Sequence, residues 1–169
     1  MQYRITMDEK RFLEITLIES KMFGQNAYLL RISDQKHCVL VDPSFEVQPI
    51  FSYLDDNGYE LDAILNTHGH IDHIVGNQPV KTRYPSVPLV IGERDKKTYE
   101  VFEKVALKMK SKIVFASDYN YSYENLIEIL YQKKNLKTVL TSLQFLSFLN
   151  IDKKHIKCGL INYQNKTNF

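Results

Sequence analysis

The sequence predicts an α+β fold in which helices pack against a sheet. Three strand-like runs follow one another closely at 11–19, 26–32 and 37–42, and strands then alternate with helices. Strands joined by short turns favour an antiparallel meander, whereas strands separated by helices favour packing of those helices on the sheet. The chain of 169 residues is long enough for one domain with its own core.

The elements after the third strand follow from apolar spacing and from turn residues. A helix is predicted where Pro49 lies near the first turn and Gly58 supplies the stop, because Val47, Ile50, Phe51 and Leu54 share one face. The remaining predicted elements are a strand at 61–66, a helix at 77–84, a strand at 87–92 and a helix at 93–110.

Composition excludes several classes of partner and predicts a cytoplasmic protein. The net charge of +2 gives no reason to expect nucleic acid or an anionic membrane. No apolar run approaches the roughly 20 residues that span a bilayer, and the N-terminus lacks an apolar signal core. Cys38 and Cys158 lie far apart and are expected to be ordinary thiols. A small-molecule substrate is the expected partner, and the oligomeric state is left open.

The character of the chain changes near residue 110. All five prolines and all five arginines precede that point, whereas 111–169 is rich in lysine and asparagine. We therefore divide the chain into 1–110 and an atypical helical tail at 111–169. Two tail helices are expected, and their apolar residues are Leu126, Ile129 and Leu130 after a Ser122 cap, and Leu136, Val139, Leu140 and Leu143.

A histidine cluster follows the strand at 61–66. His68, His70, Asp72 and His73 occur within six residues in the stretch ILNTHGHIDHIVGN. Imidazole and carboxylate groups at this spacing are ligands for zinc or another divalent first-row metal. A loop at the strand end is expected rather than one helix, since on a helix His70 would point away from the other three, and Gly69 allows a tight turn. A histidine-rich surface loop is the alternative.

This run resembles the signature of the metallo-β-lactamase fold superfamily, and within it the glyoxalase II-like hydrolases. The segments GQNAYLL at 24–30, VLVDPS at 39–44 and AILNTHGHIDHIVGN at 63–77 occur in the family's order. The resemblance covers about residues 11–105. It implies a four-layer αββα sandwich of which this chain carries the first half, with the second half atypical or missing.

The resemblance implies roles for five residues. His68 and His70 would bind a first metal, and Asp72 and His73 a second. The expected metal is zinc, as one or two ions, with iron or manganese as alternatives. Asp72 would also orient a metal-bound hydroxide that attacks a thioester or a related ester. Asp42 would orient the ligand loop, although an ordinary Asp-Pro turn explains it equally well.

The remaining ligands of a complete family site are not recognisable. Such a site needs a third histidine, a bridging aspartate and a final histidine. His155 is the only histidine downstream and is a weak ligand candidate, Asp118 is a loose candidate for the bridging aspartate, and His37 is expected to be a strand residue. The change near residue 110 and the missing ligands coincide, so we hypothesise a disrupted reading frame or a truncated variant. Apolar tail helices could then cover the sheet face left open.

Three functions remain open at this point. The leading one is a metal-dependent hydrolase acting on a thioester or related ester. The first alternative is a non-catalytic or inactive metal-binding fragment of such an enzyme. The second is a mononuclear iron sulfur-dioxygenase, which iron content and oxygen uptake would identify. A ribonuclease is disfavoured because residues 1–110 show no basic patch.

Overall fold

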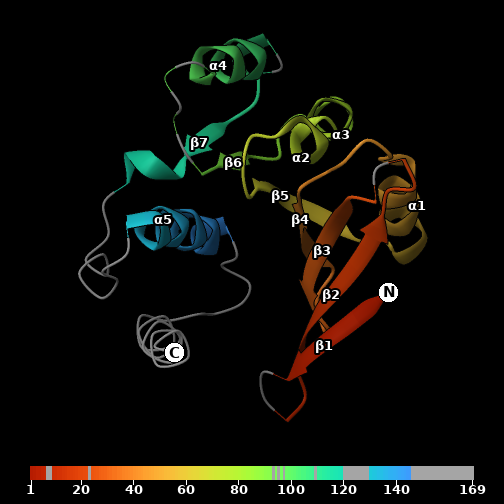
Figure 1. Ribbon diagram of the computed structural model, residues 1–169. Helices are drawn as coiled ribbons and strands as arrows, with labels where there is room; N and C mark the ends of the chain where they lie inside the picture. The colour runs from red at the N-terminus through yellow and green to blue at the C-terminus, as the bar shows by residue number, and fades with distance from the viewer. Residues whose placement is uncertain are drawn as a thin grey trace.

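Seven strands form one mixed sheet in the part of the chain that this computed structural model describes (Figure 1). The described residues are 1–6, 9–22, 24–92, 94, 96, 98–108, 110–119 and 130–145. In sheet order the strands are β1 (Gln2–Thr6), β2 (Phe12–Glu19), β3 (Asn26–Ile32), β4 (His37–Val41), β5 (Glu60–Asn66), β6 (Leu89–Ile91) and β7 (Ile113–Phe115).

The direction of pairing changes at β4. Strands β1 to β4 pair antiparallel, as expected for short connections, whereas β4 to β7 pair parallel because a helical segment separates each from the next. The carboxyl ends of β4, β5, β6 and β7 therefore lie at one edge of the sheet. Ligand sites of open α/β sheets form at this edge.

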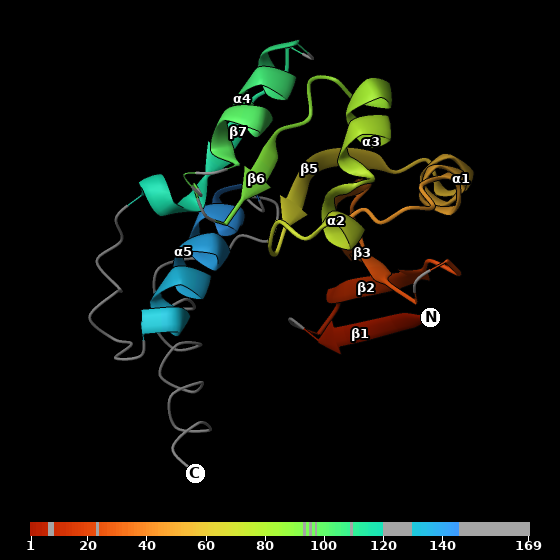
Figure 2. The same cartoon turned by 45° about the horizontal axis from the view of Figure 1, so that its top comes forward.

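Three of the helices cover one face of the sheet (Figure 2). The helices are α1 (Gln48–Asn57), α2 (Ile71–Ile74), α3 (Asn77–Arg83), α4 (Tyr99–Lys108) and α5 (Leu130–Phe145), with the 3₁₀ helix η1 (Ala116–Asp118). Ile50 and Leu54 of α1, Val80 of α3 and Phe102 of α4 pack in one cluster with the strands. The left-handed Gly58 ends α1, as the sequence predicts.

Helix α5 packs on the opposite face of the sheet. Figures 1 and 2 show α4 and α5 on opposite sides of β6 and β7. Leu136 and Leu140 of α5 are buried, and Leu143 packs against a cluster that includes Val90 and Val114. An apolar helix from the predicted tail thus covers part of the second face, as the apolar spacing suggested.

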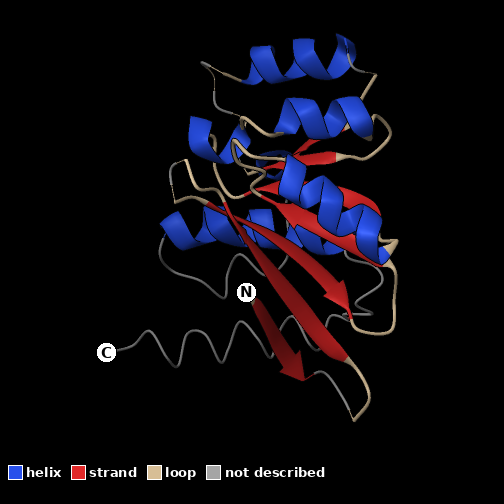
Figure 3. Ribbon diagram, turned by 90° about the vertical axis from the view of Figure 1, so that its right-hand side faces the viewer, coloured by secondary structure: helices blue, strands red, loops and turns tan. Residues whose placement is uncertain are grey.

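The same face opens to solvent toward β1. Tyr3, Ile15, Leu30 and Val39 form one row across β1, β2, β3 and β4. Val39 is fully buried, whereas the exposed fraction of Tyr3 is 45%. In Figure 3 the strands nearest the N-terminus extend away from the helices. Helix α5 therefore covers only the β5–β7 side of this face among the described residues.

The predicted α+β class and the antiparallel meander are confirmed. The predicted helix at 93–110 begins only at Tyr99, because the backbone N–H of Arg94 donates to Ser117 Oγ and its guanidinium binds Asp118 and Glu103. These contacts tie Arg94, which precedes α4, to Ser117 and Asp118 just after β7. Strand β7 was missed because three apolar residues show no periodicity of their own.

Other predictions concern residues beyond those described. The helix expected from Ser122 to Leu130 lies outside the described residues except for its last residue, and so does His155. The division at residue 110 and the disrupted reading frame stay predictions. No described helix combines the length and apolar character needed to cross a membrane.

Candidate metal centre

The candidate site lies where the loops after β4 and β5 meet, at the carboxyl edge of the parallel strands. Asp42 follows β4, and its backbone N–H donates to the Leu65 carbonyl of β5 at 2.9 Å. Thr67 and His68 follow the end of β5 directly. Adjacent parallel strands therefore bring the Asp-Pro turn and the histidine cluster together.

Gly76 holds these two loops against each other. Its backbone N–H donates to the Pro43 carbonyl at 2.9 Å. A Cβ atom at this position would lie 2.4 Å from the carbonyl oxygens of both Pro43 and Ser44. Only glycine permits this approach, so the segment after the cluster fixes the distance between the two loops.

Asp42 is the central acceptor of the site. Its exposed fraction is only 3%, and its φ of 49° places it in the left-handed region that is unusual for a residue other than glycine. Its carboxylate accepts from the Thr67 backbone N–H at 2.8 Å and from the Thr67 hydroxyl at 2.5 Å. It also accepts from His73 Nδ1 at 2.9 Å. Three local contacts thus hold a strained, buried carboxylate in place.

The histidine cluster is part loop and part helix. His68 and Gly69 lie in a loop and His70 is the N-cap of α2, but Asp72 and His73 lie on α2 itself. The prediction of a loop is therefore wrong for the last two residues, because one short turn of helix begins after His70. The ring centroid of His68 lies 4.5 Å from that of His70 and 4.0 Å from that of His73. The turn brings the three rings together.

The four predicted ligands are arranged as two pairs. His68 Nε2 lies 3.0 Å from His70 Nδ1, and His73 Nε2 lies 3.7 Å from Asp72 Oδ2. Two imidazole ligands of one tetrahedral zinc ion have their nitrogens about 3.3 Å apart, given zinc–nitrogen bonds of about 2.0 Å. The His68–His70 pair lies close to this spacing and the Asp72–His73 pair is somewhat wider. The donor types of each pair suit a divalent metal, and each pair would supply two of four ligands.

No third ligand joins either pair within the described residues. There, no group of three or more His, Cys, Asp or Glu side chains is placed to hold one ion. The Asp118 carboxylate accepts a hydrogen bond from the Arg94 guanidinium at 2.8 Å. Asp118 is therefore paired with an arginine just after β7. His37 begins β4, at the opposite end of that strand from Asp42, and its Nδ1 contacts Asp62 at 2.9 Å.

The surroundings of His68 favour its neutral form. Partial desolvation of the ring lowers the pKa of His68, and the neighbouring His73 and His70 lower it further, since a second positive charge beside them is unfavourable. Neutral imidazole is the form that binds a metal. Burial also raises the pKa of Cys38 to about 12, which disfavours its reactive thiolate form.

Sequence reasoning missed several residues that support the site. Thr67 contacts both Asp42 and His68, and the Gln25 side-chain amide lies 3.2 Å from His73 Nδ1. Asn66 Nδ2 donates to the His73 carbonyl, and Asn77 donates to Asn66 Oδ1 at 2.7 Å. The one sequence signal was the position of Thr67, a hydroxyl residue directly before the first histidine.

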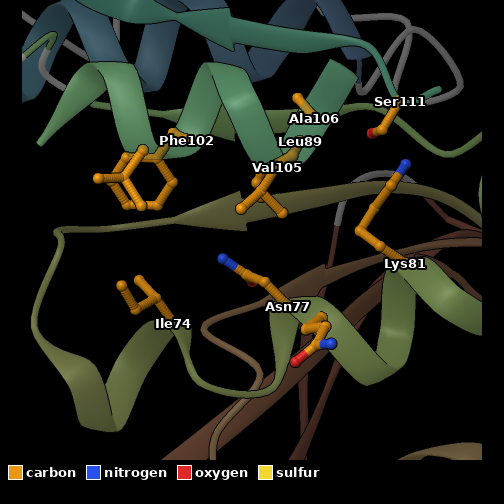
Figure 4. A pocket seen from close by; sticks show the side chains of 10 residues that line it. Ile74, Asn77, Lys81, Leu89, Phe102, Val105, Ala106 and Ser111 are labelled. Atoms are coloured by element: carbon orange, nitrogen blue, oxygen red, sulfur yellow. The ribbon is translucent and has the colours of Figure 1, made fainter. Parts of the chain in front are cut away.

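An apolar cavity of about 160 Å³ lies between α3 and α4, beside the turn that carries His73 (Figure 4). Ile74, Leu89, Phe102 and Val105 line it, and Lys81 extends across one end. The Lys81 ammonium donates to the carbonyls of Pro85 and Val87. Lys81 is only 4% exposed, and burial lowers its pKa to about 8.

The lowered pKa of Lys81 predicts a rise in stability at alkaline pH. The folded protein releases the Lys81 proton near pH 8, whereas the unfolded chain holds it up to about pH 10.5. The free energy of unfolding should therefore rise across that range by up to about 3 kcal/mol relative to Lys81→Met. Urea denaturation at several pH values measures this. Lys104→Met, at an exposed site, should keep the rise, and an equal rise in Lys81→Met would contradict the prediction.

Comparison with known proteins matches the chain to one family. The model of the metallo-beta-lactamase superfamily matches residues 21–141. The hydroxyacylglutathione hydrolase of Prochlorococcus marinus (strain MIT 9301) is 36% identical over 81 residues, which are 48% of this chain and 32% of that protein. The hydroxyacylglutathione hydrolase of Yersinia enterocolitica is 37% identical over 75 residues, 44% of this chain and 30% of that protein.

Among solved structures, the BLEG-1 B3 metallo-beta-lactamase is similar over 45% of this chain and 35% of that chain, with 29% identity and a TM-score of 0.42. The segment shared with the two curated relatives spans about a third of their length. The family model covers well over half of this chain, and its matched range contains Asp42, the histidine cluster and β7. The protein belongs to the metallo-beta-lactamase superfamily.

Proposed function

We propose that this protein is a metal-dependent hydrolase that acts on a thioester or a related ester. The observation that carries the proposal is the arrangement of His68, His70, Asp72 and His73 as two ligand pairs. A divalent metal bound there would supply a nucleophile at neutral pH and would polarise a carbonyl oxygen. Zinc, as one or two ions, is the expected metal, and iron or manganese would suit the same donors.

The residues of the site have distinct roles in this proposal. His68 and His70 would hold one ion, and Asp72 and His73 would hold the other. Asp42 holds the His73 ring by accepting a hydrogen bond from its Nδ1–H, which leaves the unprotonated Nε2 as the ligand atom. The Asp72 side chain is 40% exposed, so one of its oxygens can accept a hydrogen bond from the attacking water and orient it.

The proposed substrate class comes from the relatives. Two of them are named hydroxyacylglutathione hydrolase, which denotes hydrolysis of a thioester of glutathione. The matched segments span only 32% and 30% of those two proteins, so their full substrate does not carry over to this chain. We therefore propose the bond type, a thioester or related ester, and take the hydroxyacyl thioester of glutathione as the first compound to test.

Release of free thiol from this thioester tests the proposed function. We expect thiol release by the zinc-loaded protein, its loss after treatment with a chelator, and its return when zinc is added back. A bound metal would supply the nucleophile, so turnover and bound metal should change together. Thiol release that is unaffected by the chelator would contradict a metal-dependent mechanism.

A second candidate function is metal binding without turnover. It is favoured by the lack of a third ligand for either pair within the described residues. Two protein ligands leave an ion loosely held and incompletely oriented. This candidate predicts less than one bound metal per chain and no thiol release above background, whereas the hydrolase predicts at least one bound metal and thiol release.

A further inference from the structure

Thr67 connects the buried carboxylate of Asp42 to the first histidine of the cluster. The Thr67 hydroxyl lies 2.5 Å from Asp42 Oδ2 and 2.9 Å from His68 Nδ1. Its backbone N–H also donates to Asp42 Oδ1 at 2.8 Å, so main chain and side chain of one residue hold both carboxylate oxygens. Nothing in the proposed function uses Thr67.

The chemistry of the three groups fixes the direction of each hydrogen bond. An ionised carboxylate can only accept, so the single hydroxyl proton of Thr67 must point to Asp42. The hydroxyl oxygen then has only lone pairs to offer His68, and His68 Nδ1 must carry a proton and donate it. In a neutral imidazole the other nitrogen is then unprotonated, so His68 Nε2, which lies 3.0 Å from His70 Nδ1, presents its lone pair as the ligand atom.

We propose that Thr67 is a positioning residue that sets the tautomer of His68, and through it the metal-binding nitrogen of the first ligand pair. The inference rests on the metal site of the proposed function. His73 needs no such connector, because its Nδ1 donates to Asp42 directly at 2.9 Å. One buried carboxylate therefore orients one histidine of each pair, directly for His73 and through the Thr67 hydroxyl for His68.

This arrangement predicts an asymmetric response to removal of the hydroxyl. Thr67→Val keeps the shape of the side chain and the backbone contact to Asp42 but removes the acceptor for His68 Nδ1. His68 should then lose its preference for the Nδ1-protonated tautomer, whereas His73 should keep it. Thr67→Ser retains the hydroxyl and should behave like the wild type. A loss of general stability would affect both histidines and would not be rescued by serine.

NMR correlation of the imidazole protons with the ring nitrogens tests the inference in the metal-free protein. At about pH 8 free imidazole is mostly neutral, so the spectra report tautomers. His68→Ala and His73→Ala assign the signals. We expect Nδ1–H for His68 in the wild type and Thr67→Ser, and a changed or mixed tautomer in Thr67→Val only. An unchanged His68 tautomer in Thr67→Val, or a changed one in Thr67→Ser, would overturn the inference.

Zinc affinity measured by equilibrium dialysis extends the test to the bound state. Thr67→Val should weaken zinc binding about 10- to 100-fold, as is usual when a group that orients a ligand is lost, and Thr67→Ser should change it little. Equal zinc affinities of Thr67→Val and the wild type would overturn the proposed role of Thr67 in positioning a metal ligand. If these shifts occur but the wild type releases no thiol from a thioester, the hydrolase proposal fails and the role of Thr67 stands.

Discussion

His68→Ala and Asp72→Ala are each expected to lower thioester hydrolysis by more than about 100-fold. Loss of a group that merely orients a metal ligand costs 10- to 100-fold, and these changes remove one ligand from each pair. His68 shares its pair with His70, and Asp72 shares its pair with His73. Removing either partner leaves a single protein ligand, which cannot hold an ion in a defined geometry. The measurement is the rate of thiol release from the zinc-loaded variants.

His37→Ala is the matched control for these variants. His37 is an exposed histidine at the opposite end of β4 from Asp42, and its contact is with Asp62. The His37→Ala variant should retain full activity. All three variants should unfold at urea concentrations close to that of the wild type, because His68 is an exposed residue and Asp72 is partly exposed. Activity that survives both His68→Ala and Asp72→Ala would rule out the proposed ligands.

Gly76→Ala is expected to destabilise the fold by about 3 kcal/mol or more. Overpacking a buried site costs typically 1–3 kcal/mol when side chains can adjust. Here the new Cβ would lie 2.4 Å from two backbone oxygens, those of Pro43 and Ser44, and neither can move without displacing the turn that carries Asp42. The variant should therefore lose stability and weaken zinc binding together. Urea denaturation and equilibrium dialysis measure the two effects.

Gly69→Ala is the control from the same loop. A Cβ atom added at Gly69 would meet no other atom within 4 Å, and the backbone there is not left-handed, so alanine should change stability by no more than about 0.5 kcal/mol. Gly69 lies between two predicted ligands and Gly76 lies outside the cluster, yet the substitution of Gly76 should cost more stability. Similar stability of the two variants would show that the Gly76 contact does not fix the loops.

The sequence was most informative where side-chain chemistry and spacing are local. The strand at 26–32 and the helix ended by Gly58 followed from apolar periodicity and a stop residue. The histidine cluster after β5 was recognisable because its donor types and spacing depend only on neighbouring residues. Asp42 was weighed equally as an Asp-Pro turn, and the structure shows that its carboxylate contacts the histidine loop.

Features that depend on distant parts of the chain could not be read from the sequence. The three-residue strand β7 exists because it pairs with β6, and no local period marks it. Strand β1 was also not predicted. Tyr3 and Ile5 alternate onto one face, but it is pairing with β2 that makes this segment a strand. The contact of Gly76 with the Pro43 turn joins residues 33 positions apart, and a glycine by itself gives no indication of what approaches it.

The connection through Thr67 illustrates the same limit within the site. Threonine at the end of a strand is common because its branched side chain suits a sheet. Only the distances to Asp42 and His68 show that this hydroxyl links an acceptor to a ligand. Gln25 lies in the segment before β3, far in sequence from the cluster, and the fold brings its side-chain amide to 3.2 Å from His73 Nδ1.

Zinc binding at equilibrium is the decisive measurement for a metal centre formed by the cluster from His68 to His73. Dialysis of the wild type and of the double variant His68→Ala/Asp72→Ala against a common zinc solution, followed by determination of metal and protein, gives the number of ions per chain. We expect one to two ions per chain for the wild type and a loss of binding in the double variant. Equal binding by the two proteins, or none by the wild type, would contradict it.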